Sequence, residues 1–241
     1  MRAMILAAGL GKRMRPLTEK IPKPLLKVDD KPLIEHLIVR LVEGGITGVV
    51  VNHYYLGEMI EKFLGDGARF GIEILYSKET TLLETGGGVI NSLGKLKDES
   101  FIVVNADIWT DFNFASLKQI HEGKNLAHLI LVENSEHNRK GDFYINQAGL
   151  VSDRPSTGAA CLTFSGISVL HRKLFEGHKV QSFSFIPLLQ AAMANDRVTG
   201  EIHNGVWIDV GTPERLDEVI SLTSQITVSY THLPLPTKRI V

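Results

Sequence analysis

The chain has 241 residues, and its 26 lysine and arginine residues nearly balance 27 aspartate and glutamate residues, for a formal net charge of -1. This length suits one α/β domain or two small ones. Hydrophobic residues make up 44% of the sequence, which is typical of a globular protein rather than a disordered one. The even charge balance excludes a generally basic nucleic-acid-binding protein and an acidic-tail protein.

The single cysteine and the short apolar runs indicate where in the cell the protein is expected to work. Cys161 is the single cysteine, which excludes an internal disulfide and a cysteine-based zinc site. The apolar runs fall far short of the ~18 residues that a membrane-spanning helix needs. Ala3 to Ala8 are followed at once by basic residues, unlike a signal peptide. We therefore expect a cytoplasmic protein with no membrane or nucleic-acid partner, of unknown oligomeric state.

Short apolar runs alternate with segments of helical periodicity in the first half of the chain. We expect strands at residues 3–8, 49–52, 72–76, 101–105 and 126–133. We expect helices from a cap at Asp30 to Gly44, at 56–64, at 89–93 directly after Gly86, Gly87 and Gly88, and at 114–120. This alternation predicts an α/β fold, in which a mixed, mostly parallel sheet has helices on both faces.

The second half of the chain has a different order of predicted elements. It predicts a hairpin at 143–152, a strand at 162–170, a helix at 185–194, a strand at 206–210 and a helix from Thr212 and Pro213 to about Ser224. No linker separates the halves, so we expect one domain at residues 1–226. Residues 227–241 lack periodicity, and we expect a disordered tail that resembles a translated cloning adapter rather than native sequence.

A glycine loop follows the first strand. Backbone amides of Gly9 and Gly11, beside the charges of Lys12 and Arg13, suit phosphate oxygens. The dinucleotide motif is excluded because Met14 stands where its third glycine belongs, and the Walker A motif because Arg13 follows Lys12. A plain glycine turn with solvated basic residues is the alternative.

Three charged residues outside this loop also suit phosphate chemistry. Two prolines flank Lys23 and fix the backbone that presents it, as a phosphate clamp would require. Asp107 and Asp209 each follow a short apolar run, where a carboxylate is a natural Mg²⁺ ligand. Each aspartate has an alternative as a cap or turn residue. Asp111 is the second choice of metal ligand and is interpreted as a loop or cap residue.

Together, residues 7–16 and Lys23-Pro24-Leu25 resemble the sugar-1-phosphate nucleotidylyltransferase family, and the resemblance covers Met1 to about Ser224. Within that family, the chain is most similar to bacterial N-acetylmuramate-1-phosphate uridylyltransferases at residues 83–88, 105–111, 141–143, 163–167 and 207–212. The resemblance implies a Rossmann-like nucleotidyltransferase fold, with the active site at the carboxyl ends of the strands.

The resemblance also implies residue roles. The catalytic residues would be Arg13, Lys23 and Asp107. The nucleotide would contact Ala8, Gly9, Gly11, Lys12, Arg13, Lys23, Gly86, Gly87 and Asn105. The sugar phosphate would contact Asn105, Gly141, Asp142 and Ser165. Mg²⁺ would be held by Asp107 and Asp209.

The expected reaction joins a nucleoside triphosphate to a sugar 1-phosphate, giving a nucleotide sugar and pyrophosphate. The specific expectation is UTP with N-acetylmuramate 1-phosphate, a step in recycling cell-wall sugars, with Arg139 or Lys140 meeting the lactyl carboxylate. One alternative is mannose or glucose 1-phosphate with GTP, dTTP or UTP, although no room remains after Ser224 for the β-helix that many guanylyl members carry. The other is a non-catalytic regulatory homologue, which the presence of all four charged residues disfavours.

Overall fold

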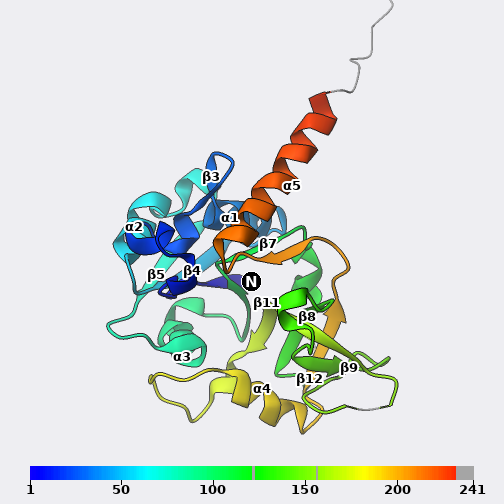
Figure 1. The fold of residues 1–241 in the computed structure, drawn as a ribbon. Helices are drawn as coiled ribbons and strands as arrows, with labels where there is room; N and C mark the ends of the chain where they lie inside the picture. The colour runs from blue at the N-terminus through cyan, green and yellow to red at the C-terminus, as the bar shows by residue number, and fades with distance from the viewer. Residues whose placement is uncertain (121–122, 156, 232–241) are drawn as a thin grey trace, which may run out of the picture.

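The computed structural model describes residues 1–120, 123–155 and 157–231 (Figure 1). Its sheet is built around β1 (Arg2–Leu6), which pairs in parallel with β4 (Gly48–His53) on one side and β6 (Ser100–Asn105) on the other. β5 (Glu73–Lys78) adds a further parallel strand beside β4. These four strands are the parallel half that the sequence predicts.

The other half of the sheet is mixed. β11 (Ala160–His171) runs antiparallel to β6 and to β8 (Ala127–Val132), and β12 (Val198–Ile202) runs parallel to β8. The first part of β11 also pairs with β9 (Phe143–Ile145), whose hairpin partner is β10 (Val151–Ser152). Because β11 is antiparallel to both β6 and β8, those two strands point the same way and end at the same edge.

Helices cover both faces, as expected. Successive strand residues point to opposite faces, so Ala3 and Ile5 pack against α1 (Leu33–Glu43) and α2 (Gly57–Leu64). Met4 packs on the other face with α3 (Glu84–Leu96) and α4 (Ile186–Met193), which lie together at the bottom of Figure 1. Burial on both faces explains why these strands are continuously apolar.

Several local expectations are wrong. Asp30 does not cap α1, because it lies in the turn of a hairpin between β2 (Lys27–Val28) and β3 (Lys31–Pro32), and Pro32 is the N-cap. Gly86, Gly87 and Gly88 lie inside α3 rather than before it. The segment Phe114–Gln119 is a 3₁₀ helix. The strands β2 and β3 are unanticipated, and so are β12 and β7 (Ile108–Thr110), which pairs with β13 (Trp207–Asp209).

The last helix, α5 (Pro213–Thr231), begins where the sequence predicts and projects away from the sheet in Figure 1. Leu216 and Val219 on its first turns are buried with Met14 of the glycine loop and with Val28. The helix therefore helps to hold the loop. Of the tail that the sequence predicts to be disordered, residues 227–231 belong to this helix and 232–241 lie outside the described residues.

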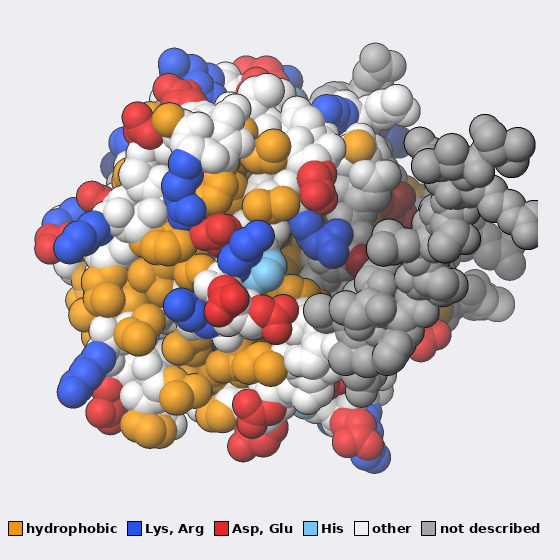
Figure 2. Space-filling view, turned by 90° about the horizontal axis from the view of Figure 1, so that it is seen from above, with side chains coloured by type: hydrophobic (Ala, Val, Ile, Leu, Met, Phe, Trp, Pro, Cys, Tyr) orange, Lys and Arg blue, Asp and Glu red, His pale blue; other side chains and the backbone are white. Residues whose placement is uncertain are grey.

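On the surface seen from above, hydrophobic side chains form a broad area, and acidic and basic side chains are scattered within and around it (Figure 2). This mixture matches the formal net charge of -1. Within the described ranges, no helix has both the length and the apolar character needed to cross a bilayer.

Candidate active site

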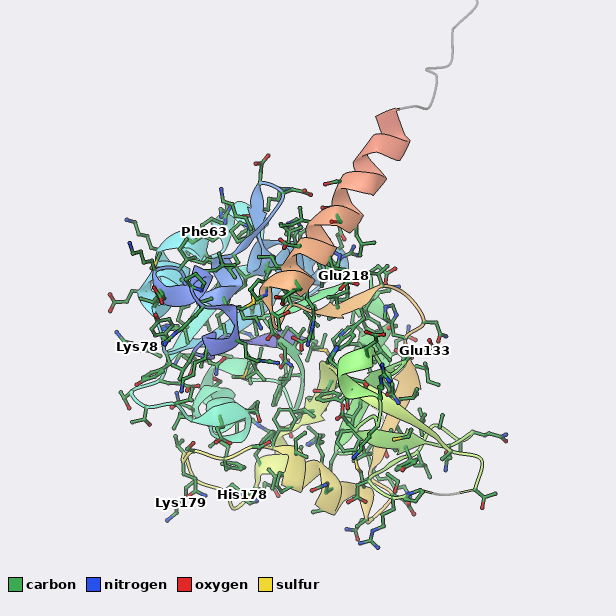
Figure 3. All side chains as sticks on the ribbon, viewed as in Figure 1. Phe63, Lys78, Glu133, His178, Lys179 and Glu218 are labelled. Atoms are coloured by element: carbon green, nitrogen blue, oxygen red, sulfur yellow. The ribbon has the colours of Figure 1, made fainter. Side chains whose placement is uncertain are left out.

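The carboxyl ends of the central strands meet in one cleft. Leu6, Asn52 and Asn105 lie side by side in the sheet register at the carboxyl ends of β1, β4 and β6. Lys78, which ends β5, and Glu133, which follows β8, lie on opposite flanks of this edge in Figure 3. The crevice outside such an edge is the usual ligand site of open α/β sheets.

Three adjoining cavities of about 400, 360 and 340 Å³ make up this cleft. Asp107 lines all three, so it stands at their junction. The first cavity lies beside Ala8 and the start of α3, the second contains the glycine loop, and the third lies beside Asp209 and the start of β11. We refer to them as the first, second and third cavities.

The glycine loop presents unused amides to the second cavity. Within the described part of the chain, the backbone N–H groups of Gly9, Leu10 and Gly11 donate no hydrogen bond to the protein. Gly11 has a left-handed φ of 61°, and its carbonyl accepts a 2.7 Å hydrogen bond from Thr18 Oγ1. Lys12 and Arg13 line the same cavity. Free amides beside positive side chains form a phosphate cradle.

Lys23 completes the cradle from a different turn. Its backbone begins a 3₁₀ turn after Pro22, and its side chain is only 11% exposed. The ammonium Nζ lies 2.5 Å from Oδ2 of Asp107 and lines the second cavity. The buried charge is thus balanced by a carboxylate, which leaves the ammonium at the point where all three cavities meet.

The two aspartates are brought together by the small β7–β13 sheet. In its register Asp209 faces Ile108, the residue after Asp107, and the N–H of Val210 donates a 2.8 Å hydrogen bond to the carbonyl of Asp107. Both side chains line the third cavity. Two carboxylates beside a phosphate site fit Mg²⁺, which takes one or two protein carboxylates and completes its shell with phosphate oxygens and water.

Arg215 is a site residue that sequence reasoning missed. Its Nη1 donates to the backbone carbonyl of Asp209 at 2.8 Å and to Oδ2 at 2.7 Å. The pair is largely buried, with the arginine side chain 16% exposed. These two bonds fix the carboxylate of Asp209, and they exist only because the first turn of α5 folds back over the end of β13.

Asp111 and His53 lie in ion pairs away from the two aspartates. Asp111 pairs with Nε2 of His203 at 2.9 Å, so its role as alternative metal ligand finds no support in the geometry. His53 is 1% exposed and lies 2.6 Å from Oε1 of Glu61. Among the described residues, no cluster of three or more His, Cys, Asp or Glu side chains forms a metal site.

The glycines of α3 serve close packing. The N–H of Gly86 donates a 2.8 Å hydrogen bond to the carbonyl of Phe183, and a Cβ on Gly87 would collide with the carbonyl of Gln181. Glu84 and Thr85, rather than these glycines, line the first cavity. Nucleotide contact by Gly86 and Gly87 stays a prediction. Their close packing also positions Glu84 and Thr85 beside the first cavity.

A buried network joins the glycine loop to α3. Asn52 Oδ1 accepts a 2.9 Å hydrogen bond from the N–H of Ala7, and its amide donates to Glu79 Oε1 at 2.7 Å. Glu79 Oε2 in turn accepts from the N–H of Leu83 at 3.0 Å. Burial raises the pKa of the Glu79 carboxyl, against the two hydrogen bonds it accepts. Sequence reasoning found neither Asn52 nor Glu79, because nothing local links them.

Three of the four predicted sugar-contacting residues line the third cavity, and Gly141 does not. Asn105 and Asp142 line it, and Oδ2 of Asp142 accepts a 2.8 Å hydrogen bond from the N–H of Phe164. Gly141 has a φ of 68°, with no room for a Cβ beside Cys161 and Asn134. Ser165 lines the cavity too, but its hydroxyl donates to the carbonyl of Ile130 at 2.7 Å. Any contact of Ser165 with a sugar is therefore expected from its backbone.

The expected lactyl partners are placed elsewhere. Arg139 has a side chain that is 78% exposed, 3.9 Å from Glu136, and neither it nor Lys140 lines the third cavity. His137 and Asn138, the two residues just before them, do line it. The turn at residues 136–138 places the half-buried Asn138 and the exposed His137 along this cavity, a placement that the linear sequence does not reveal.

The fold and the cleft together are those of an α/β enzyme whose cleft, at the carboxyl edge of the sheet, suits phosphorylated substrates. The profile of the family described as nucleotidyl transferase matches residues 2–225. The chain belongs to this family and is a sugar-1-phosphate nucleotidylyltransferase. Members of the family generally use a divalent metal, which agrees with the paired carboxylates.

Individual relatives differ in how similar their sequences are to this chain. The chain is 45% identical to an N-acetylmuramate alpha-1-phosphate uridylyltransferase of Neisseria meningitidis, covering 92% of this chain and 98% of the relative. It is 31% identical to the protein of the same name from Caulobacter vibrioides, covering 88% and 92%. A mannose-1-phosphate guanyltransferase of Gibberella zeae is 32% identical, covering 89% of this chain but 62% of the relative.

Solved structures support the fold. A putative glucose-1-phosphate thymidylyltransferase from Bacillus anthracis superposes with a TM-score of 0.78 over 98% of both chains, at 19% identity. The Rossmann-like nucleotidyltransferase fold expected from the sequence is thereby confirmed.

Proposed function

We propose that this enzyme transfers UMP from UTP to N-acetylmuramate 1-phosphate, giving UDP-N-acetylmuramate and pyrophosphate, and that it serves cell-wall sugar recycling in the cytoplasm. The observation that carries the chemistry is the convergence of Lys23, Asp107 and Asp209 on a loop with free amides. The choice of substrates rests on the 45% identity with the Neisseria relative.

Direct displacement explains the residues present. A phosphate oxygen of the sugar 1-phosphate attacks the α-phosphorus of UTP, and the bond from that phosphorus to the bridging oxygen of the β-phosphate breaks. The electron pair leaves with pyrophosphate, so no covalent enzyme intermediate is required. Catalysis then consists of positioning and charge neutralisation.

Each group has a place in this scheme. The amides of Gly9 to Gly11, with Lys12 and Arg13, hold the β- and γ-phosphates in the second cavity. Lys23 neutralises charge near the α-phosphate. Asp107 and Asp209 would hold Mg²⁺, which supplies charge neutralisation between the phosphates when bound. The nucleoside occupies the first cavity and the sugar the third, so the α-phosphorus lies near Asp107.

The main alternative keeps the reaction and changes the substrates to mannose 1-phosphate and GTP. The 32% identity with the Gibberella relative favours this alternative less than the 45% identity with the Neisseria relative favours UTP and N-acetylmuramate 1-phosphate. A panel of UTP, GTP and dTTP against N-acetylmuramate, N-acetylglucosamine, mannose and glucose 1-phosphates, followed by pyrophosphate release, separates the two.

The proposal predicts the highest kcat/KM for UTP with N-acetylmuramate 1-phosphate, at least tenfold above N-acetylglucosamine 1-phosphate. A charged hydrogen bond to the lactyl group is worth roughly 1.5–3 kcal/mol, or one to two decades. Equal use of the two sugars, or a preference for mannose 1-phosphate with GTP, would overturn the substrate assignment and leave the reaction class intact.

A further inference from the structure

The third cavity has a phosphate end and a sugar end. Arg13 and Asp107 line it and also line the second cavity, so they mark the end where the phosphates lie. His137, Asn138 and Thr163 line the third cavity and neither of the other two. A sugar whose 1-phosphate sits near Asp107 therefore extends its ring toward these three residues.

If the substrate is N-acetylmuramate 1-phosphate, as proposed above, this end must accept a second negative charge. The lactyl ether on C3 carries a carboxylate that N-acetylglucosamine lacks. Asp142 lines the same cavity, and a like charge beside it would repel the lactyl group. The carboxylate thus needs a donor or cation at the sugar end, away from Asp142.

Most polar groups there are already engaged. The amide of Asn138 donates to Thr163 Oγ1 at 3.2 Å, and that hydroxyl donates to Asn134 Oδ1 at 2.8 Å. The indole N–H of Trp207 donates to the carbonyl of Ser165 at 2.9 Å. The Thr163 hydroxyl and the Trp207 N–H are thereby used in the cavity wall, and the Asn138 amide keeps one further N–H, which is neutral.

His137 is the basic residue at the sugar end of the third cavity. Among the described residues, the basic side chains that line this cavity are those of Arg13 and His137, and Arg13 belongs to the phosphate end. Ser135 Oγ lies 2.8 Å from its Nδ1 and 3.1 Å from its Nε2, so the one hydroxyl pairs with a single ring nitrogen at a time and the exposed ring keeps the other for a ligand. Either neutral tautomer of an imidazole has one N–H to donate, and the protonated form has two and a positive charge.

We propose that His137 binds the lactyl carboxylate and selects N-acetylmuramate 1-phosphate over N-acetylglucosamine 1-phosphate. The sequence alone did not single out His137, because Arg139 and Lys140 nearby are the more obvious charged residues. Its role is one of specificity, since it faces the sugar and not the reacting phosphates.

The test measures kcat/KM with UTP for both sugar phosphates in the wild type, His137→Ala, His137→Lys and Arg139→Ala. We expect the ratio of kcat/KM for N-acetylmuramate 1-phosphate to that for N-acetylglucosamine 1-phosphate to fall at least tenfold in His137→Ala and to recover substantially in His137→Lys, which supplies a cationic donor at the same position. Arg139→Ala should leave the ratio unchanged. Calorimetric binding of UDP-N-acetylmuramate should weaken in His137→Ala by a similar factor, while binding of UDP-N-acetylglucosamine should weaken much less.

The outcomes separate this inference from the proposed function. A wild type without preference for the muramate sugar overturns the substrate assignment and this inference with it. A wild type that prefers the muramate sugar, with the same ratio in His137→Ala, overturns the role of His137 alone. A fall in the ratio in Arg139→Ala instead would give the lactyl contact to that arginine.

Discussion

Lys23 Nζ lies 2.5 Å from Oδ2 of Asp107, although 84 residues separate the two in the chain. The pair places an ammonium and a carboxylate at the junction of the three cavities, where the α-phosphate of a nucleotide would react. With one carboxylate oxygen directed at Lys23, the other is left for a metal ion. The predictions below begin from this arrangement.

Replacement of Asp107 should abolish turnover without unfolding the protein. Asp107→Asn removes a metal-holding charge, so we expect kcat to fall by at least about 100-fold, in line with the loss of a key electrostatic group. EDTA should abolish wild-type activity, and added Mg²⁺ should restore it. Asp111→Asn, which breaks only the pair with His203, is the control and should retain most activity. Near-normal turnover by Asp107→Asn would remove that residue from the ligand set.

Arg215 should govern metal affinity through Asp209. Arg215→Met removes both hydrogen bonds that hold the Asp209 carboxylate, so we expect the Mg²⁺ concentration at half-maximal activity to rise about 10-fold or more, as when an outer partner of a metal ligand is lost. Arg154→Met removes a positive charge from a side chain that is 87% exposed and should change nothing. An unaltered Mg²⁺ requirement in Arg215→Met would refute this role.

Two glycines in the same helix should respond in opposite directions to alanine. A Cβ on Gly87 collides with the carbonyl of Gln181, so Gly87→Ala should destabilise the protein by about 2 kcal/mol or more. An alanine at Gly94 meets nothing within 4 Å and should stabilise the helix by about 0.5–1 kcal/mol. Urea unfolding of both variants checks this. Equal changes in the free energy of unfolding of the two variants would mean that the loop containing Gln181 moves aside for the methyl group of Gly87→Ala.

His128 should make the protein sensitive to acid. Burial lowers its pKa to about 4, so the folded state keeps the ring neutral where the unfolded chain, with a value near 6.5, binds a proton. The stability from this residue is complete above about pH 6.5 and is lost as the pH falls toward 4, by about 3 kcal/mol.

The His128→Asn variant isolates this effect. Its unfolding free energy should depend less steeply on pH than that of the wild type between pH 6.5 and 4, measured by urea titration at several pH values. Parallel pH dependences for the two proteins would assign the acid sensitivity to other groups.

The sequence by itself determined the class of this protein. Strands such as Val49–Asn52 and the stripe on α1 follow from local periodicity, and the alternation of the two requires a covered, mostly parallel sheet. The glycine loop and Lys23 were found because their chemistry lies in contiguous residues. The same holds for the start of α5 at Pro213, which a local cap signal marks.

Only the tertiary structure decided how distant residues combine. The pairing of β7 with β13 places Asp209 beside Asp107, and the return of α5 sets Arg215 on Asp209. The turn at residues 136–138 places His137 along the sugar end and leaves Arg139 outside. Such contacts join segments far apart in the chain or depend on the direction of a side chain, and local propensity encodes neither. Packing of the whole sheet fixes both, because each cavity wall is shared by strands and loops from both halves of the chain.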